Sequence, residues 1–281
     1  YFCWFFFITF VIFLYGPTFT IVLLSFQGPE GGLTFPMNGF SFHWFEKLWE
    51  GGGYVDIGSA FRRSILLGII LMILTVILSV STGMAFRKKF FGSNFLFFLT
   101  ISSLIVPSII LSLGVALEFR LIDETIKFIG NKYNIDWIIN DFQTTLNMFS
   151  SGLGAQLTWT LPFGLLIMFA IFNRFDKSYE EASKDLGATS WQTFKYIVLP
   201  IIAPSVIGIA LFGFTLSYDE LARSSQVMGA TNTLPLELKG LTTTVTTPVI
   251  YALGTLTTGI SFLVIFIAIC SFFIIKRKKI K

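Results

Sequence analysis

Six long stretches of apolar residues constrain the fold of this chain more than any other feature of its sequence. A helix rises about 1.5 Å per residue, so roughly 20 apolar residues cross a hydrocarbon core about 30 Å thick. Hydrophobic residues make up 54% of the chain and charged residues only 13%. The pattern predicts an all-α integral membrane protein with one domain over residues 1–281. The six predicted transmembrane helices are Phe2–Phe26, Ser64–Phe86, Phe95–Leu117, Leu153–Phe172, Ile201–Leu221 and Val249–Ile275.

The first apolar stretch begins almost at Tyr1. We expect the native N-terminus to lie upstream. The stretch Phe2–Phe26 is longer than the hydrophobic region of a signal peptide, and no charged segment precedes it. It is therefore predicted to stay in the protein as a transmembrane helix.

Basic residues gather on one predicted side of the membrane. Three segments hold twelve of the 20 Lys and Arg residues but only four of the 16 Asp and Glu residues. Because Lys and Arg accumulate in cytoplasmic loops, both termini are predicted to be cytoplasmic. The formal net charge of +4 thus reflects topology and does not indicate a nucleic-acid partner. The basic residues are Arg87, Lys88, Lys89, Arg174, Lys177, Lys184, Lys195, Lys276, Arg277, Lys278, Lys279 and Lys281, and the acidic ones are Asp176, Glu180, Glu181 and Asp185.

Residues suited to metal, cofactor or nucleotide chemistry are sparse. Cys3 and Cys270 both fall inside apolar stretches and are expected to be reduced packing residues. The single histidine, His43, has no second His or Cys nearby in the sequence. No Gly-rich phosphate loop is present. We therefore expect no metal site, no cofactor and no enzyme activity, and any ATP-driven work requires a partner protein.

The cytoplasmic segment between the fourth and fifth predicted helices carries helix-start and helix-stop signals. Ser178 with Glu181, and Thr189 with Gln192, each match a capping box, in which two side chains satisfy free backbone donors at a helix start. Gly187 lies between them and can adopt the left-handed conformation that ends a helix. The segment is predicted to fold as helix, glycine turn, helix.

The second short helix has apolar residues at helical spacing, Trp191, Phe194, Ile197 and Val198. This face can lie against the membrane helices or a partner protein. The alternative is a solvated amphipathic loop whose capping signals are accidental.

One motif in this segment consists of Glu181, Ala182, Ser183, then Gly187 after three residues, Ile197 after nine more, and Leu199 and Pro200 after one more. This motif resembles the EAA loop of binding-protein-dependent ABC importer permeases. It departs from the family pattern only at Ser183, where the family has Ala. The resemblance implies that residues 174–203 form the coupling element that docks on a cytoplasmic ATPase subunit.

The same resemblance implies a set of partners. These are two ABC ATPase subunits, a second permease subunit, and a periplasmic or extracellular substrate-binding protein, assembled in the inner membrane of a bacterium. Closure of the ATPase subunits would move the loop and switch the cavity between inward and outward openings. The rival reading is a secondary transporter, but neither an internal repeat nor a charge in the middle of a predicted helix supports it.

Two further stretches, Phe214–Glu220 and Leu234–Leu236, resemble the spermidine/putrescine permease subgroup. Permeases for other small organic solutes carry similar stretches, so an amino acid derivative, a sugar or an osmolyte is the alternative substrate.

The adjacent carboxylates Asp219 and Glu220 are predicted near the outer end of the fifth helix. Beside Tyr218, they could receive an amine through charge and cation–π attraction. The alternative is that Asp219 pairs with Arg223 one helical turn further on. Two more candidates for the substrate path are Glu118, at the end of the third predicted helix, and Trp159, next to the kinking residue Pro162 in the fourth.

Two outer loops, Gln27–Ser59 and Asp123–Ser151, are candidate surfaces for a substrate-delivery protein.

Overall fold

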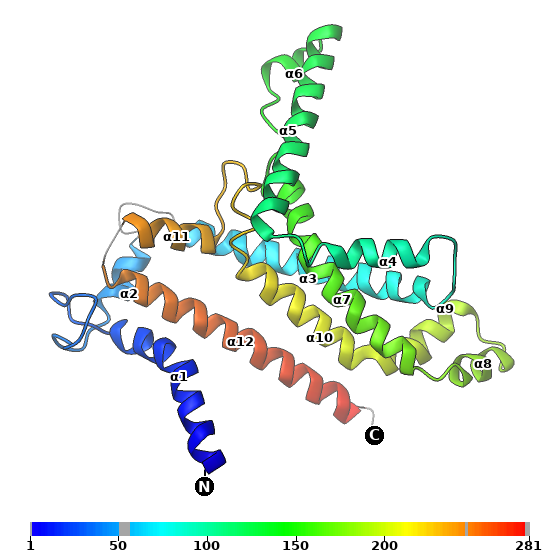
Figure 1. Ribbon diagram of the computed structural model, residues 1–281, viewed down its shortest axis with the longest axis horizontal. Helices are drawn as coiled ribbons and strands as arrows, with labels where there is room; N and C mark the ends of the chain where they lie inside the picture. Colours follow the sequence, from blue (N-terminus) through cyan, green and yellow to red (C-terminus); the bar gives the residue numbers. More distant parts are fainter. Residues whose placement is uncertain (1, 51–56, 245–246, 279–281) are drawn as a thin grey trace. The chain divides into compact units, whose positions relative to one another are not determined.

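The computed structural model describes residues 2–50, 57–244 and 247–278, with the side chains of 2, 49, 244, 268, 269 and 271–278 excepted. Within these ranges every regular element is a helix (Figure 1), and the only bridge pair joins Gln27 to Phe40. The predicted basic tail includes Lys279 and Lys281, which lie outside the described residues. The elements are α1 (Phe2–Leu24), α2 (His43–Trp49), α3 (Ile57–Phe86), α4 (Ser93–Ser102), α5 (Ser108–Tyr133), α6 (Asp136–Asn140), the π-helical turn η1 (Met148–Gly152), α7 (Leu153–Arg174), α8 (Ser178–Asp185), α9 (Ser190–Thr193), the π-helical turn η2 (Phe194–Val198), α10 (Leu199–Tyr218), α11 (Leu234–Thr244) and α12 (Val249–Lys278).

Five helical stretches in the described residues are long and apolar enough to cross a membrane. Many of their large apolar side chains are exposed, as expected for surfaces that face lipid. The prediction of a helical integral membrane protein is confirmed. The stretches are Cys3–Leu24, Ile57–Phe86, Met148–Arg174, Ser190–Tyr218 and Val249–Ile267.

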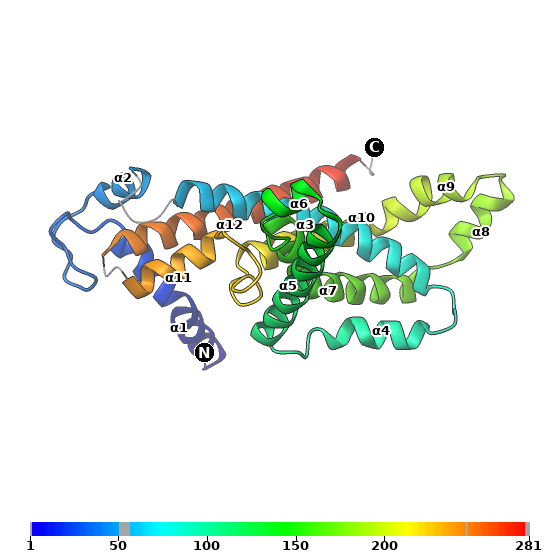
Figure 2. The same cartoon turned by 90° about the horizontal axis from the view of Figure 1, so that it is seen from above.

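The third predicted helix, Phe95–Leu117, is wrong as a continuous element. The structure ends α4 at Ser102 and begins α5 only after Pro107, with α5 running across the direction of α4 (Figures 1 and 2). Proline lacks a backbone N–H and disfavours the helical conformation of the residue before it, here Val106. The break at residues 103–107 therefore follows from Pro107.

The described residues form two compact units. One combines the chain up to Arg62 with Leu236–Ile267, and the other is built mainly from Arg63–Pro235. In the first unit, Gln27 is buried and its side chain bonds the carbonyl of Gly32 and the N–H of Asn38, which fixes the turn after α1.

In the second unit, α3, α7 and α10 surround one apolar core. Two glycines allow the close approach of α3 to α7, because a Cβ on Gly83 would lie 2.7 Å from the Cβ of Met168, and one on Gly164 would lie 2.0 Å from the Ser79 hydroxyl. The buried core residues are Val80, Met168, Phe172, Val198, Ile202 and Ile209.

Candidate functional site

The segment from α8 to α10 has the predicted helix, turn, helix order. Gly187 follows α8 with φ of 82°, a left-handed conformation that glycine adopts without strain. Thr189 and Gln192 form the predicted capping box, since the Gln192 side chain accepts from the Thr189 N–H and the Thr189 hydroxyl accepts from the Gln192 N–H. These local predictions are confirmed.

The predicted capping box of Ser178 and Glu181 is wrong. Ser178 is the first residue of α8 itself, preceded by Lys177 at the N-cap position, so its hydroxyl cannot cap the helix from outside. The Asp176 carboxylate instead accepts the Ser178 N–H at 2.9 Å. This backbone bond, with help from the Ser178 hydroxyl, lowers the pKa of Asp176. A carboxylate two residues upstream therefore caps the helix start.

Ser183, where the sequence departs from the family motif, joins the two short helices. Its hydroxyl lies 2.8 Å from the Thr193 hydroxyl, and both side chains are buried. By contrast, Glu181 and Ala182 are exposed. The departure at Ser183 thus supplies a hydrogen bond that an alanine could not make.

The end of the motif runs without a break into the membrane. Ile197 lies in η2, and Leu199 begins α10 and packs against the apolar core. Pro200 is the second residue of α10 and directly follows the π-helical turn η2. The described helical stretch Ser190–Tyr218 is 29 residues long.

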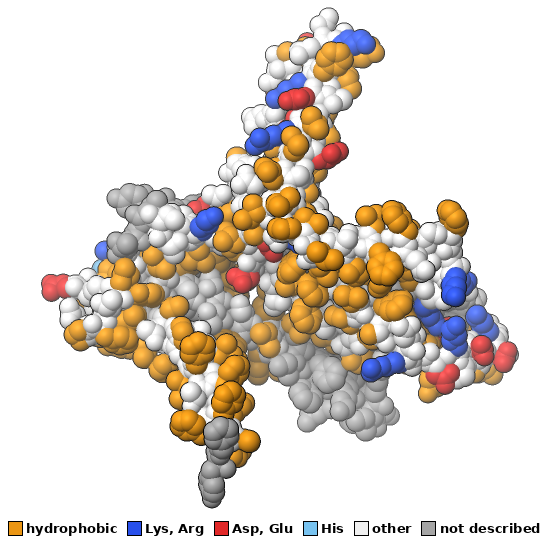
Figure 3. Space-filling model, in the orientation of Figure 1, with side chains coloured by type: hydrophobic (Ala, Val, Ile, Leu, Met, Phe, Trp, Pro, Cys, Tyr) orange, Lys and Arg blue, Asp and Glu red, His pale blue; other side chains and the backbone are white. Residues whose placement is uncertain are grey.

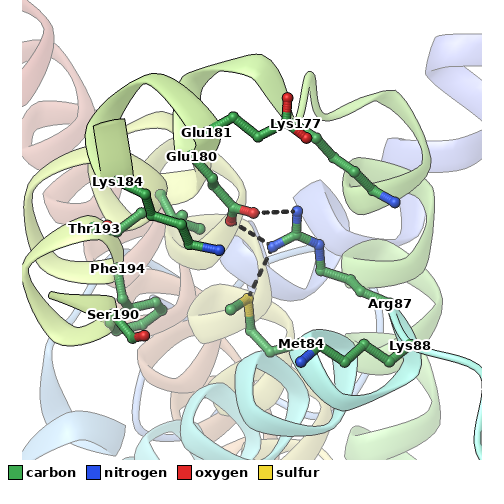
Figure 4. Close-up of a pocket in the computed structure, with 11 residues that line it drawn as sticks. Met84, Arg87, Lys88, Lys177, Glu180, Glu181, Lys184, Ser190, Thr193 and Phe194 are labelled. Carbon is green, nitrogen blue, oxygen red and sulfur yellow. Dashed lines mark hydrogen bonds and ion pairs between the residues drawn. The ribbon is translucent and has the colours of Figure 1, made fainter. Parts of the chain in front are cut away.

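Sequence reasoning missed Arg87, the residue that ties α8 to the end of α3. Its two terminal nitrogens donate to the two carboxylate oxygens of Glu180, at 2.6 and 3.0 Å (Figure 4). The guanidinium also lies over the rings of Phe172 and Phe175, at 5.0 and 5.1 Å. These residues are far apart in sequence, so no local pattern could have indicated the contact.

A hollow of about 350 Å³ lies between the end of α3 and the two short helices. Figure 3 shows Lys and Arg side chains gathered at this end of the unit, with acidic side chains beside them. The surface is therefore polar and charged, in contrast to the apolar flanks of α4 and α7. The residues that line the hollow include Met84, Arg87, Lys88, Lys177, Glu180, Glu181, Lys184, Ser190, Thr193, Phe194 and Val198 (Figure 4).

The second group of predicted site residues lies at the other end of α10. Tyr218 is buried and stacks on Phe214, with ring centroids 5.6 Å apart. Asp219 is exposed, and the Glu220 carboxylate accepts the backbone N–H of Arg223 at 2.8 Å. Glu118 is exposed on α5, and in the part of the chain described here no hydrogen bond or ion pair joins it to Asp219.

The alternative pairing of Asp219 with Arg223 is wrong. The chain leaves the helix after Tyr218, so Arg223 does not lie one helical turn from Asp219. Its guanidinium instead lies over the Trp159 ring, 4.6 Å from the centroid, and donates to the Thr158 hydroxyl at 2.5 Å. The structure thereby brings Trp159 next to the segment that carries the two carboxylates.

Buried polar bonds hold this segment against α7. The Gln156 side chain donates to the Ser224 hydroxyl at 2.8 Å and accepts from the Ser217 hydroxyl at 2.6 Å. The Ser151 hydroxyl donates to the Val227 carbonyl at 2.6 Å. Residues 219–233 are therefore fixed in place without forming a regular helix. Among the described residues, no group of three or more His, Cys, Asp and Glu side chains is arranged to hold a metal ion.

Comparison with known proteins identifies the family to which this chain belongs. A family model described as the binding-protein-dependent transport system inner membrane component matches residues 76–278, and the chain belongs to this family. It is thus a permease component of a transport system, a multi-pass protein of the inner membrane, and not itself an enzyme.

Individual relatives are similar over most of the chain. The spermidine/putrescine transport system permease protein PotC of Haemophilus influenzae is 28% identical, over 87% of this chain and 86% of the relative. The putrescine transport system permease protein PotI of Escherichia coli is 29% identical, over 91% and 85%. The PotC homolog of Mycoplasma pneumoniae is 24% identical, over 83% and 77%.

Proposed function

We propose that this chain is the membrane-spanning subunit of an ABC importer that carries polyamines such as spermidine or putrescine into the cytoplasm. The observation that carries the substrate class is that its relatives in three organisms are named as polyamine permeases or as a homolog of one. The carboxylates of Asp219 and Glu220, directly after α10, suit an organic cation.

The proposed topology has six crossings and two cytoplasmic termini. The proposed third crossing is formed by α4 with the turn at residues 103–107, after which α5 leaves at the outer surface. With ten residues, or about 15 Å of helix, α4 is shorter than the other five crossings. An even number of crossings places the basic residues Arg87 and Lys177 on the same side as the C-terminal Lys and Arg residues, as the distribution of positive charge favours. Five crossings would separate them.

The proposed coupling element is residues 174–203, within a single permease domain covering residues 1–281. One of the two ATPase subunits would contact the surface formed by α8, Gly187 and α9, and a second permease subunit would complete the path. Three features support a stiff lever: the Arg87–Glu180 pair, the Ser183–Thr193 bond and the continuity of η2 with α10. A stiff element passes movement at its tip to the helices that hold it.

A substrate-binding protein would deliver the cation from the outer side. The hairpin of α5 and α6 offers it an ordered surface, since Asp123 bonds Thr144 and Thr145 and closes the hairpin.

The experiment is uptake of labelled putrescine by cells that lack their own polyamine importers and express the complete transport system with or without this chain. Uptake that requires the chain, and that excess spermidine suppresses but excess glycine betaine or maltose does not, is the expected result. Uptake of an osmolyte or sugar instead would reject the polyamine assignment.

A further inference from the structure

Among the described residues, the buried guanidinium of Arg223 has no carboxylate within ion-pair distance, although Glu220 is close enough to interact with its charge. The side chain is 0% exposed. In the described residues its guanidinium has only neutral hydrogen-bond partners, because Nε donates to the Ser108 hydroxyl at 3.3 Å, and the terminal nitrogens donate to the Thr158 hydroxyl at 2.5 Å and the Ser103 carbonyl at 3.1 Å. Burial of a charge without an ionic partner is costly, so this arrangement requires an explanation.

The groups around this guanidinium make a site for an organic cation. The Trp159 ring, 4.6 Å from Cζ, supplies a π face, and three neutral oxygens supply acceptors. A π face with neutral acceptors is a common arrangement for recognising alkylammonium ions. The oxygens come from the break between α4 and α5, from the start of α5 and from α7, so the site is built by three segments that do not include residue 223 itself.

The backbone of Arg223 is held by hydrogen bonds that do not involve its guanidinium. The backbone carbonyl of Arg223 accepts from the Ser112 hydroxyl at 2.7 Å, and its N–H donates to Glu220 at 2.8 Å. The neighbouring Ser224 is held by Gln156. Rotation of one side chain would therefore open the site without releasing the segment.

We propose that the Ser103 carbonyl, the Ser108 and Thr158 hydroxyls and the Trp159 ring form a binding site for one alkylammonium group of the transported substrate, and that Arg223 occupies this site in the present conformation. The inference rests on the proposed function and adds a residue-level site to it. Arg223 and the substrate amine compete, so the site is filled by the protein's own cation whenever substrate is absent.

The first test uses the assembled transporter and butylammonium chloride as the probe. Arg223→Ala empties the site, so butylammonium should raise the thermal midpoint of this variant by a few degrees relative to equal sodium chloride, and should leave the wild type unchanged. The rise should disappear in Arg223→Ala/Trp159→Leu. It should persist in Arg223→Ala/Phe163→Leu, a matched control, because Phe163 contacts Trp159 edge-on at 5.2 Å. Equal shifts in all variants, or no shift in Arg223→Ala, would overturn the site.

If Arg223→Ala does not assemble, Arg223→Met, which removes the charge but keeps an unbranched side chain, replaces it in the same test. Butylammonium should raise the thermal midpoint of Arg223→Met. The rise should disappear in Arg223→Met/Trp159→Leu and persist in Arg223→Met/Phe163→Leu. No rise in Arg223→Met, or equal rises in all three variants, would overturn the proposal. A butylammonium shift in a transporter that imports no polyamine would support the site and reject only the polyamine assignment.

Discussion

Arg87, the residue after the long helix α3, donates to both carboxylate oxygens of Glu180 in α8. This two-point ion pair joins the end of a long membrane helix to the first short helix of the predicted coupling element. Both side chains are mostly buried, at 12% and 18% exposure. A planar guanidinium that meets a carboxylate at two points fixes orientation as well as distance. The pair is therefore suited to keep α8 in register with α3 while the loop moves.

Removing this pair should uncouple transport. Arg87→Ala leaves the partly buried Glu180 carboxylate without its partner. We expect the free energy that holds α8 against the end of α3 to fall by about 1–3 kcal/mol. Transport should fall at least tenfold while the amount of inserted protein stays near normal. The measurement is ATP-dependent uptake divided by inserted permease.

Two control variants sharpen this test. Lys89→Ala removes a nearby exposed cation outside the lining of the hollow and should be nearly silent. The double variant Arg87→Glu/Glu180→Arg, which swaps the two charges, should recover part of the transport activity if the ion pair itself is required. Full activity in Arg87→Ala would reject the role of the pair.

The turn at Gly187 should tolerate asparagine and reject valine. A Cβ at this position meets nothing within 4 Å, so the cost is the left-handed backbone itself, about 1–2 kcal/mol. Asn adopts this conformation more readily than a β-branched residue. We expect Gly187→Val to assemble yet stimulate its ATPase poorly, and Gly187→Asn to stay close to normal. Gly208→Ala, also with open space around its Cβ, is the matched control. Equal ATPase stimulation in the Val and Asn variants would contradict the turn assignment.

The topology is open to a direct labelling test. A cysteine at Lys89 should be protected from an impermeant maleimide in intact cells, whereas a cysteine at Lys132, near the end of α5, should react. Permeabilised cells provide the control, because both positions should then react. Labelling at position 89 in intact cells would contradict the cytoplasmic location of the coupling element.

Asp219 and Glu220 should differ in their contributions to uptake. Glu220 already accepts the Arg223 N–H, and Glu220→Gln preserves an acceptor there. Asp219 is exposed and free to meet a cation. A charge contact at 4 Å is worth up to about 4 kcal/mol at an effective dielectric of about 20, and exposure to water reduces this. We expect Asp219→Asn to lower putrescine uptake about tenfold, which corresponds to about 1.4 kcal/mol. A loss below twofold at equal expression would remove Asp219 from the substrate path.

The hairpin of α5 and α6 should loosen in acid. Burial raises the pKa of Asp123, but hydrogen bonds from the Thr144 hydroxyl and from the Thr145 hydroxyl and N–H outweigh it and hold the pKa below its usual value of 3.8. Because the folded pKa is the lower one, this contribution to stability is complete above pH 3.8 and is lost as the pH falls through the folded pKa. The rate of amide hydrogen exchange at residues 142–147, relative to the intrinsic rate at the same pH, should rise in that range. Asp123→Asn should exchange faster at neutral pH and lose most of the acid dependence, and an unchanged acid response in that variant would reject the assignment.

Much of the coupling element could be predicted because its signals are local. Gly187 and the Thr189–Gln192 capping box each depend on residues within one turn of one another, and the structure has both. The Ser178 capping box failed by a shift of one position, because Asp176 competes for the same helix start. Pro107 indicates a helix break before α5. The sequence alone does not show that α5 runs in a different direction from α4 instead of continuing as one kinked helix.

The contacts between distant segments could not be predicted in the same way. Arg87 and Glu180 are 93 residues apart, and Arg223 meets Ser103 across 120 residues. Such pairs depend on how helices pack, and hydropathy alone does not specify partners. The alternative pairing of Asp219 with Arg223 fails because it assumes helical spacing, whereas the helix ends at Tyr218.

The most direct test of the central claim is putrescine uptake into proteoliposomes that contain this permease with its partner permease and ATPase subunits, with the binding protein supplied outside. The account predicts accumulation of labelled putrescine that requires ATP inside the vesicles, ceases when the binding protein is omitted, and is strongly reduced by Arg87→Ala. Accumulation that proceeds without ATP and follows an imposed ion gradient would contradict it.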